Sequence, residues 1–136
     1  MTTRLGTVAA LAAIAVAATA GAAWACHCAT YKSAADQLSA ADVMFVGRAV
    51  ESEPESGRLA GMTRNITRFA VTKTLKGEVP PTVEVLHEPA RKKNCGVSFR
   101  PGQTRIIFAR RNADGVLETS GCDAPQFLLV DYEAAR

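Results

Sequence analysis

The chain has 136 residues, a length typical of one domain. Its 16 Lys/Arg and 13 Asp/Glu give a net charge of +3 at pH 7, which is too balanced to indicate nucleic acid or an anionic surface as the partner. We find no nucleophile with its base, no paired acids and no phosphate-binding loop in the sequence, and therefore do not expect an enzyme.

The first 25 residues have the features of a secretory signal peptide. A short start with one basic residue, Arg4, precedes a run of small and apolar residues over 5–20, and Ala23-Trp24-Ala25 supplies the small-x-small pattern that signal peptidase recognises. The alternative is a membrane anchor, but a run made mostly of Ala is barely apolar enough to stay in a bilayer. We expect 1–25 to be removed, which predicts a secreted protein, extracellular or periplasmic in a Gram-negative host, without stable membrane insertion.

Cleavage would leave residues 26–136 as one domain with a net charge of +2, because only Arg4 among the charged residues is lost. The polar, Ala-rich stretch 31–41 has no β-branched residue and predicts a loop and a short helix. Strand-forming residues then fill 42–54 as far as Pro54, and again 62–77.

Three further strands are predicted over 82–89, 103–111 and 116–120, the last two joined by a hairpin turn at Asn112–Gly115. After Cys122 the sequence fits either a short helix starting near residues 123–125 or an extended tail. Five short strands with small helices at the ends indicate a small β-barrel. We expect the basic loop 91–95 to be solvated and His87 to be structural or solvated.

All four cysteines lie in the expected mature part: Cys26, Cys28, Cys95 and Cys122. An even number of cysteines in an exported chain favours two disulfides. A bridge between Cys26 and Cys28 would be strained, and this leaves two long-range pairings open. The alternative is a metal site made of Cys26-His27-Cys28 with Cys95 or Cys122, but its spacing is unlike the usual zinc knuckle and export argues against free thiolates.

Several segments, in this order, resemble the inhibitory, netrin-like domain of the tissue inhibitors of metalloproteinases, and in particular a short bacterial-type member. They cover nearly all of residues 26–125. The resemblance rests on the Cys-x-Cys start and on "ADVMFVGRAVE", "FAVTKTLKG", "CGVSFRPGQTRIIFA" and "DGVLETSGC".

This resemblance implies an all-β fold, a five-stranded OB-fold barrel with short flanking helices and with the N-terminal segment across its rim. It also implies two disulfides, Cys26 to Cys95 and Cys28 to Cys122. We expect a monomer with no cofactor and no metal of its own.

The function that the resemblance implies is inhibition of a zinc metalloproteinase. In this family the free α-amine and the carbonyl of the first cysteine, here Cys26, chelate the catalytic zinc of the target. The next residue enters the specificity pocket, and here it is His27 where family inhibitors have a small Thr or Ser. Because folds host unrelated functions, the alternative is a secreted netrin-like module that binds another protein or a glycan without inhibiting a protease.

Overall fold

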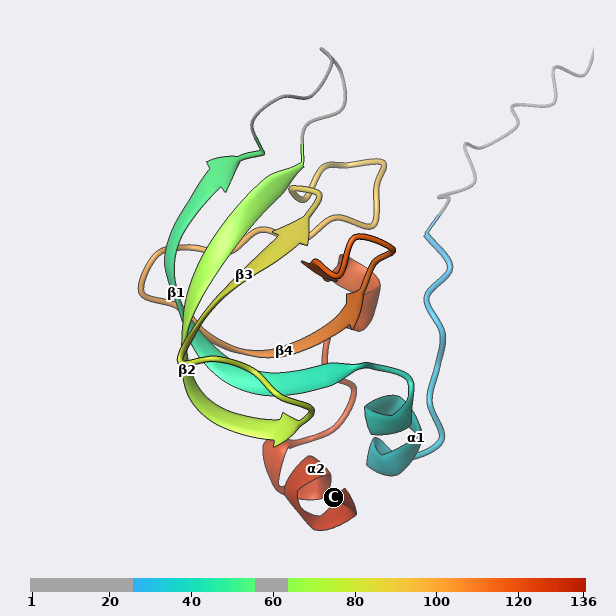
Figure 1. Cartoon of the computed structure of the whole chain (residues 1–136). Coiled ribbons are helices and arrows are strands. Elements are labelled where there is room, and N and C mark those ends of the chain that lie inside the picture. The colour runs from blue at the N-terminus through green and yellow to red at the C-terminus, as the bar shows by residue number, and fades with distance from the viewer. Residues whose placement is uncertain (1–25, 56–63) are drawn as a thin grey trace, which may run out of the picture.

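A computed structural model describes residues 26–55 and 64–136. The expected signal segment 1–25 lies outside these residues. Five strands close into a barrel with the order β1-β2-β3-β5-β4 (Figure 1). The strands are β1 (Val43–Pro54), β2 (Asn65–Lys76), β3 (Thr82–His87), β4 (Thr104–Arg111) and β5 (Leu117–Glu118).

The barrel closes because β1 has two partners. It pairs antiparallel with β2 along most of its length and with β4 through residues 43–48. Its register with β2 shifts at three places, and a Cβ on Gly47 would lie 2.9 Å from the Phe45 ring. Bulges and a glycine let a strand bend in this way. Strand β5 pairs parallel with β3 and antiparallel with β4, which completes the ring of strands. The resulting strand order confirms the expected five-stranded OB-fold barrel.

Alternation along the strands builds two apolar clusters. Phe45 and Ile107 point into the barrel, whereas their neighbours Met44 and Phe108 point outward beneath the helices. The interior is filled by Val43, Phe45, Ala49, Phe69, Val83, Val85, Phe99, Ile107, Ala109 and Leu117.

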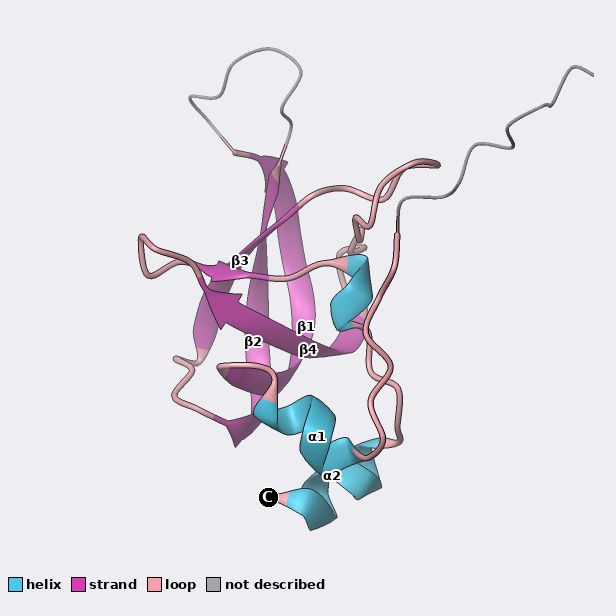
Figure 2. Cartoon of the chain, turned by 90° about the vertical axis from the view of Figure 1, so that its right-hand side faces the viewer, coloured by secondary structure: helices cyan, strands magenta, loops and turns pink. Residues whose placement is uncertain are grey.

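The flanking helices α1 (Ala34–Ser39) and α2 (Leu129–Ala135) cover the outer cluster side by side at one end of the barrel (Figures 1 and 2). Ser33 caps the start of helix α1, since its hydroxyl accepts a hydrogen bond from Asp36 N at 3.1 Å. Tyr132 of α2 is fully buried and its ring meets Phe108 edge to face. No helix within the described ranges is long and apolar enough to cross a membrane.

Two sequence predictions need correction near the C-terminus. The fifth strand is only Leu117–Glu118, because Ser120 begins a 3-10 turn, η1 (Gly121–Asp123), in which Asp123 accepts from Ser120 N at 2.8 Å. The last helix exists but starts at Leu129, beyond the expected residues 123–125. Its start is fixed by Asp131, whose carboxylate accepts from Leu128 N at 3.0 Å.

Candidate functional site

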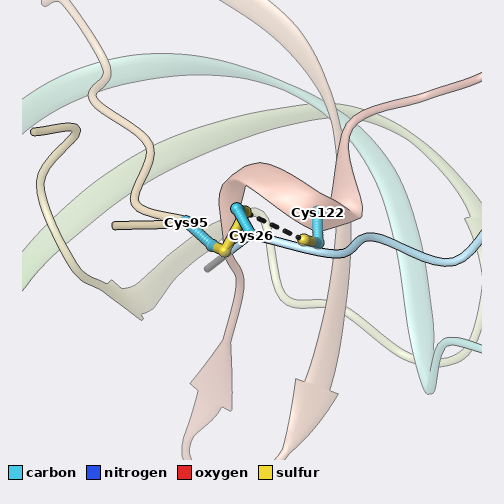
Figure 3. Close-up of side chains that lie close together, drawn as sticks. All are labelled: Cys26, Cys95 and Cys122. Atoms are coloured by element: carbon cyan, nitrogen blue, oxygen red, sulfur yellow. Dashed lines mark hydrogen bonds between the residues drawn. A yellow bond between two sulfur atoms is a disulfide. The ribbon is translucent and has the colours of Figure 1, made fainter. Parts of the chain in front are cut away.

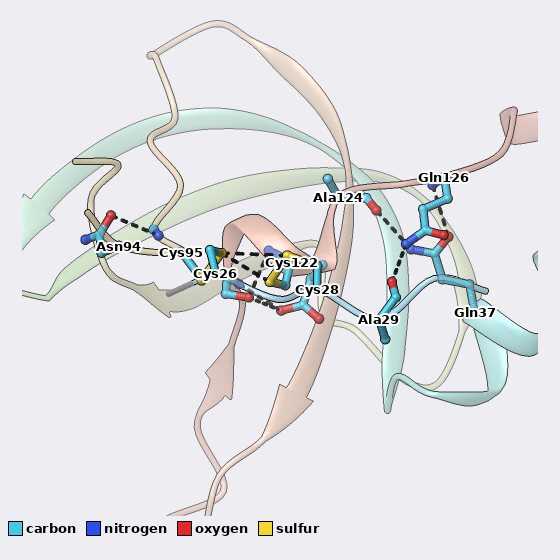
Figure 4. Close-up of a disulfide and its surroundings, with 12 residues drawn as sticks. Cys26, Cys28, Ala29, Gln37, Asn94, Cys95, Cys122, Ala124 and Gln126 are labelled. Carbon is cyan, nitrogen blue, oxygen red and sulfur yellow. Dashed lines mark hydrogen bonds between the residues drawn. A yellow bond between two sulfur atoms is a disulfide. The ribbon is translucent and has the colours of Figure 1, made fainter. Parts of the chain in front are cut away.

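All four cysteines meet at one edge of the barrel, which we call the cysteine edge: residues 26–28, the loop 91–97 between β3 and β4, and residues 120–123 (Figures 3 and 4). Residues 26–28 have no regular secondary structure and are exposed. From there the chain runs beside the barrel to α1, as the blue segment of Figure 1 shows.

Two disulfides fasten the exposed segment to two different parts of the barrel. Cys26 is bonded to Cys95, with Cα atoms 5.5 Å apart, and Cys28 to Cys122, with Cα atoms 5.0 Å apart. These are the pairings that the resemblance implies and that the residues alone left open. His27 therefore lies between two anchored residues.

The two disulfides also contact each other. The sulfur of Cys26 lies 3.7 Å from that of Cys122 and 3.8 Å from that of Cys28. Because the bonded sulfurs carry no hydrogen, these are van der Waals contacts; Figure 3 marks the one to Cys122. The four sulfur atoms thus form one cluster.

Two glycines beside the cysteines let the backbones approach closely. A Cβ on Gly96 would lie 2.3 Å from the carbonyl oxygen of Pro89, and one on Gly121 would lie 2.8 Å from that of Gly96. Between them, Gly121 N donates to Cys95 O at 2.6 Å. Both glycines lie in the sequence motifs given above, but no local pattern indicated that they allow this close approach. Their contacts come from segments far apart in the chain.

The loop that carries Cys95 is organised by Asn94. Its side-chain oxygen accepts from Arg91 N at 2.9 Å and Gly96 N at 3.1 Å, and its amide donates to Pro89 O at 3.0 Å. Lys92 and Lys93 point into solvent, so this part of the loop is solvated as expected. The cysteine edge therefore carries positive charge beside Cys95.

Two glutamines hold the chain that follows Cys28. The exposed Gln126 amide donates to Ala29 O at 2.7 Å and accepts from Tyr31 N at 3.0 Å (Figure 4). Buried Gln37 in turn donates to Ala124 O at 2.9 Å and accepts from Gln126 N at 3.1 Å and from the Tyr132 hydroxyl. No sequence pattern indicated these glutamines, because the groups that they bind lie 87 or more residues away in the chain.

The two histidines differ in environment. His27 is exposed, and no hydrogen bond or ion pair among the described residues engages its imidazole. His87 is 2% exposed, packs edge to face against Phe99, and has Nδ1 2.7 Å from Val97 O and Nε2 2.6 Å from the Thr67 hydroxyl. Burial lowers the pKa of His87, partly offset by the carbonyls of Val97 and Glu88. His87 is thus structural and positions Val97, two residues after Cys95.

A hollow of about 230 Å³ lies beside the cysteine edge. Small-molecule sites usually enclose about 300–1,000 Å³, so the hollow is small for such a ligand. It is lined by Val97, Phe99, Arg105, Ile106, Ile107, residues 119–121 and residues 123–125.

No protein-family model matches the chain, and a search of curated proteins found no match.

Proposed function

We propose that the mature protein is a secreted inhibitor of zinc metalloendopeptidases that binds the catalytic zinc of its target through Cys26. One observation carries the proposal: Cys26 is exposed at an edge of the closed barrel, and the disulfides of Cys26 and Cys28 anchor the chain on both sides of His27. The resemblance of the sequence to the metalloproteinase inhibitors supports the same assignment.

The chemistry needs Cys26 to be the first residue of the mature chain. Removal of residues 1–25 then gives Cys26 a free α-amine next to its own carbonyl oxygen, and the two atoms form a chelate. A catalytic zinc keeps one coordination position for water and accepts nitrogen and oxygen donors there. An α-amine titrates at about 7.7–8.0, so an appreciable neutral fraction is available at neutral pH.

The cysteine edge supports tight binding by being ordered before the target arrives. The disulfides, the Gly121–Cys95 hydrogen bond and the Gln126 contacts each restrict the segment around Cys26. Ordering a flexible segment on binding costs free energy, and a segment already held in place avoids most of that cost.

In this proposal His27 decides which proteases are inhibited. Its exposed side chain follows the zinc-binding residue and would enter the specificity pocket of the target. An imidazole is larger than the Thr or Ser of the family and needs a deeper pocket. Replacing His27 by Thr should therefore widen the range of inhibited proteases.

The test compares two forms of the mature protein on a panel of zinc metalloendopeptidases. One form starts at Cys26 and the other carries one additional Ala before it. We expect only the first to inhibit, because the extension converts the amine into an amide that no longer binds zinc. Circular dichroism and thiol counting establish that both forms are folded and bridged.

The other outcomes are equally informative. Equal inhibition by the two forms would exclude chelation by the amine. If neither form nor the His27→Thr variant inhibits while all are folded, the protein is better described as a module that binds another protein or a glycan.

A further inference from the structure

The hollow beside the cysteine edge is lined by an arginine on the inward side of β4. Ile107 and Ala109 point into the barrel, and Arg105 continues this alternation near the start of the strand. Its side chain is half-buried, and the guanidinium carbon lies 5.9 Å from the centre of the Phe99 ring. We propose that the hollow binds a small carboxylate that carries a short apolar group, with Arg105 as the anion-binding residue.

No acidic group of the protein neutralises Arg105. All 13 Asp and Glu lie within the residues that the structure describes, because residues 1–25 and 56–63 contain none. Among the described residues, no ion pair and no side-chain hydrogen bond involves this guanidinium, whose one recorded contact is with Phe99. The planar fork of an arginine matches the two oxygens of a carboxylate. The guanidinium therefore favours a carboxylate as the charged group of the ligand.

The other polar side chains of the hollow are already bonded within the protein. The Thr119 hydroxyl donates to Phe108 O at 2.7 Å. The Asp123 carboxylate accepts from Ser120 N at 2.8 Å and from the Ser120 hydroxyl at 2.9 Å, and it pairs with Arg110 at 3.5 Å. Because the charge of Asp123 is already compensated, the hollow favours an anionic ligand over a cationic one.

The remaining walls determine the uncharged part of the ligand. They are apolar and come from three segments: Val97 and Phe99, Ile106 and Ile107, and Ala124 and Pro125. A volume of about 230 Å³ is below that of most small-molecule sites, so a single branched aliphatic group suits the hollow better than a nucleotide or a sugar chain. Ala124 is exposed, so the hollow is accessible from solvent. This inference is independent of protease inhibition.

The experiment titrates the folded, oxidised protein with isovalerate and follows the amide signals by NMR. We expect saturable shifts at residues 97–99, 105–107 and 119–124 and at the side-chain Nε–H of Arg105. The matched probe is isovaleramide, which has nearly the same shape and no charge. It should bind at least about tenfold more weakly, because it cannot form a charge-assisted pair with the guanidinium.

Two arginine variants locate the anion-binding group. Arg105→Gln should lower the affinity for isovalerate by more than about tenfold. Arg48→Gln makes the same change at an exposed residue of β1, whose partner on β4 is Thr104, the residue before Arg105. This control should bind isovalerate as the parent does. The comparison of acid and amide uses the parent protein, so it tests the proposal even if Arg105→Gln does not fold.

A third probe identifies the source of the carboxylate. An acetylated dipeptide that ends in Leu presents a branched aliphatic group and a carboxylate at a peptide C-terminus. Tighter binding of this peptide than of isovalerate would assign the site to peptide C-termini, and weaker binding would assign it to free acids. The proposal is overturned by the absence of saturable shifts, by shifts away from the hollow, by equal binding of acid and amide, or by equal losses in the two arginine variants.

Discussion

The barrel and the cysteine edge are held together by different means. In the barrel, alternating apolar residues are buried between hydrogen-bonded strands, and Phe45 and Phe69 are fully buried. The cysteine edge has only one short 3-10 turn, and its segment 26–28 is exposed. There, disulfides, glycine contacts and single side chains bonded to the backbone take the place of buried apolar surface. The comparison indicates that the barrel supplies stability and that the edge supplies a fixed, accessible backbone.

The largest effect on stability is expected from the barrel interior. Phe69 lies between Phe45 and Phe99, with ring centroids 5.9 and 5.0 Å away in edge-to-face contact. Phe69→Ala should lower the free energy of unfolding by about 3–5 kcal/mol, because it leaves a cavity that the closed barrel does not fill. Urea denaturation measures this, and a loss below that of the disulfide variant described next would contradict the comparison.

Removal of a disulfide should come second. The Cys28–Cys122 bridge spans 94 residues, and replacing both cysteines by Ser should lower the free energy of unfolding by about 2–5 kcal/mol. The proposed protease inhibition should also be impaired, since residues 26–28 lose one of their two anchors. Chemical denaturation and inhibition assays on the same sample separate the two effects, and unchanged inhibition by the folded variant would argue against a role for this anchor.

A methyl group at Gly121 should act mainly on the edge. The Cβ of Gly121→Ala would meet backbone oxygens of Gly96 and Cys95 at 2.8 and 3.0 Å, and overpacking of this kind costs about 1–3 kcal/mol. We also expect faster reduction of the disulfides by dithiothreitol, because the loops must move apart.

The matched control is Gly115→Ala in the hairpin turn. Its Cβ meets nothing within 4 Å, but its φ of +79° disfavours alanine, so we expect a cost of about 1 kcal/mol. The disulfides of this variant should be reduced at the parental rate. Equal rates in both glycine variants would show that Gly121 does not hold the edge closed.

The smallest effect on stability is expected from protonation of His87. This residue of β3 contacts Val97 in the loop of the cysteine edge and so links the two regions. Burial lowers its pKa below 6.5, so between the two values the unfolded chain binds more protons than the folded one. Stability from neutral His87 is therefore complete above pH 6.5 and falls as the pH drops toward the lowered pKa. The slope should not exceed about 1.4 kcal/mol per pH unit.

Urea denaturation between pH 7.5 and 5 measures this component. His87→Gln should remove it from the pH profile, whatever the variant's stability at pH 7.5. An identical profile in the variant would assign the dependence to other groups.

Local sequence patterns predicted where four of the five strands lie and where the hairpin turn falls at Asn112–Gly115, because alternation and turn residues act over a few neighbouring positions. They also marked Cys26, His27 and Cys28 as exceptional, although the pairing of the cysteines came from a family resemblance and not from their spacing. Local patterns carry no information on which distant segments meet.

Other features depend on contacts between segments that are far apart in the chain. The short β5, the start of α2 at Leu129, the close approach at Gly96 and Gly121, and the bonds of Gln37 and Gln126 all depend on partners far away in the chain. The same holds for the contact between the two disulfides, since four sulfurs from three segments meet only after the barrel has closed. Because closure of the barrel fixes these distances, the chemistry of the cysteine edge follows from the fold and not from the motif.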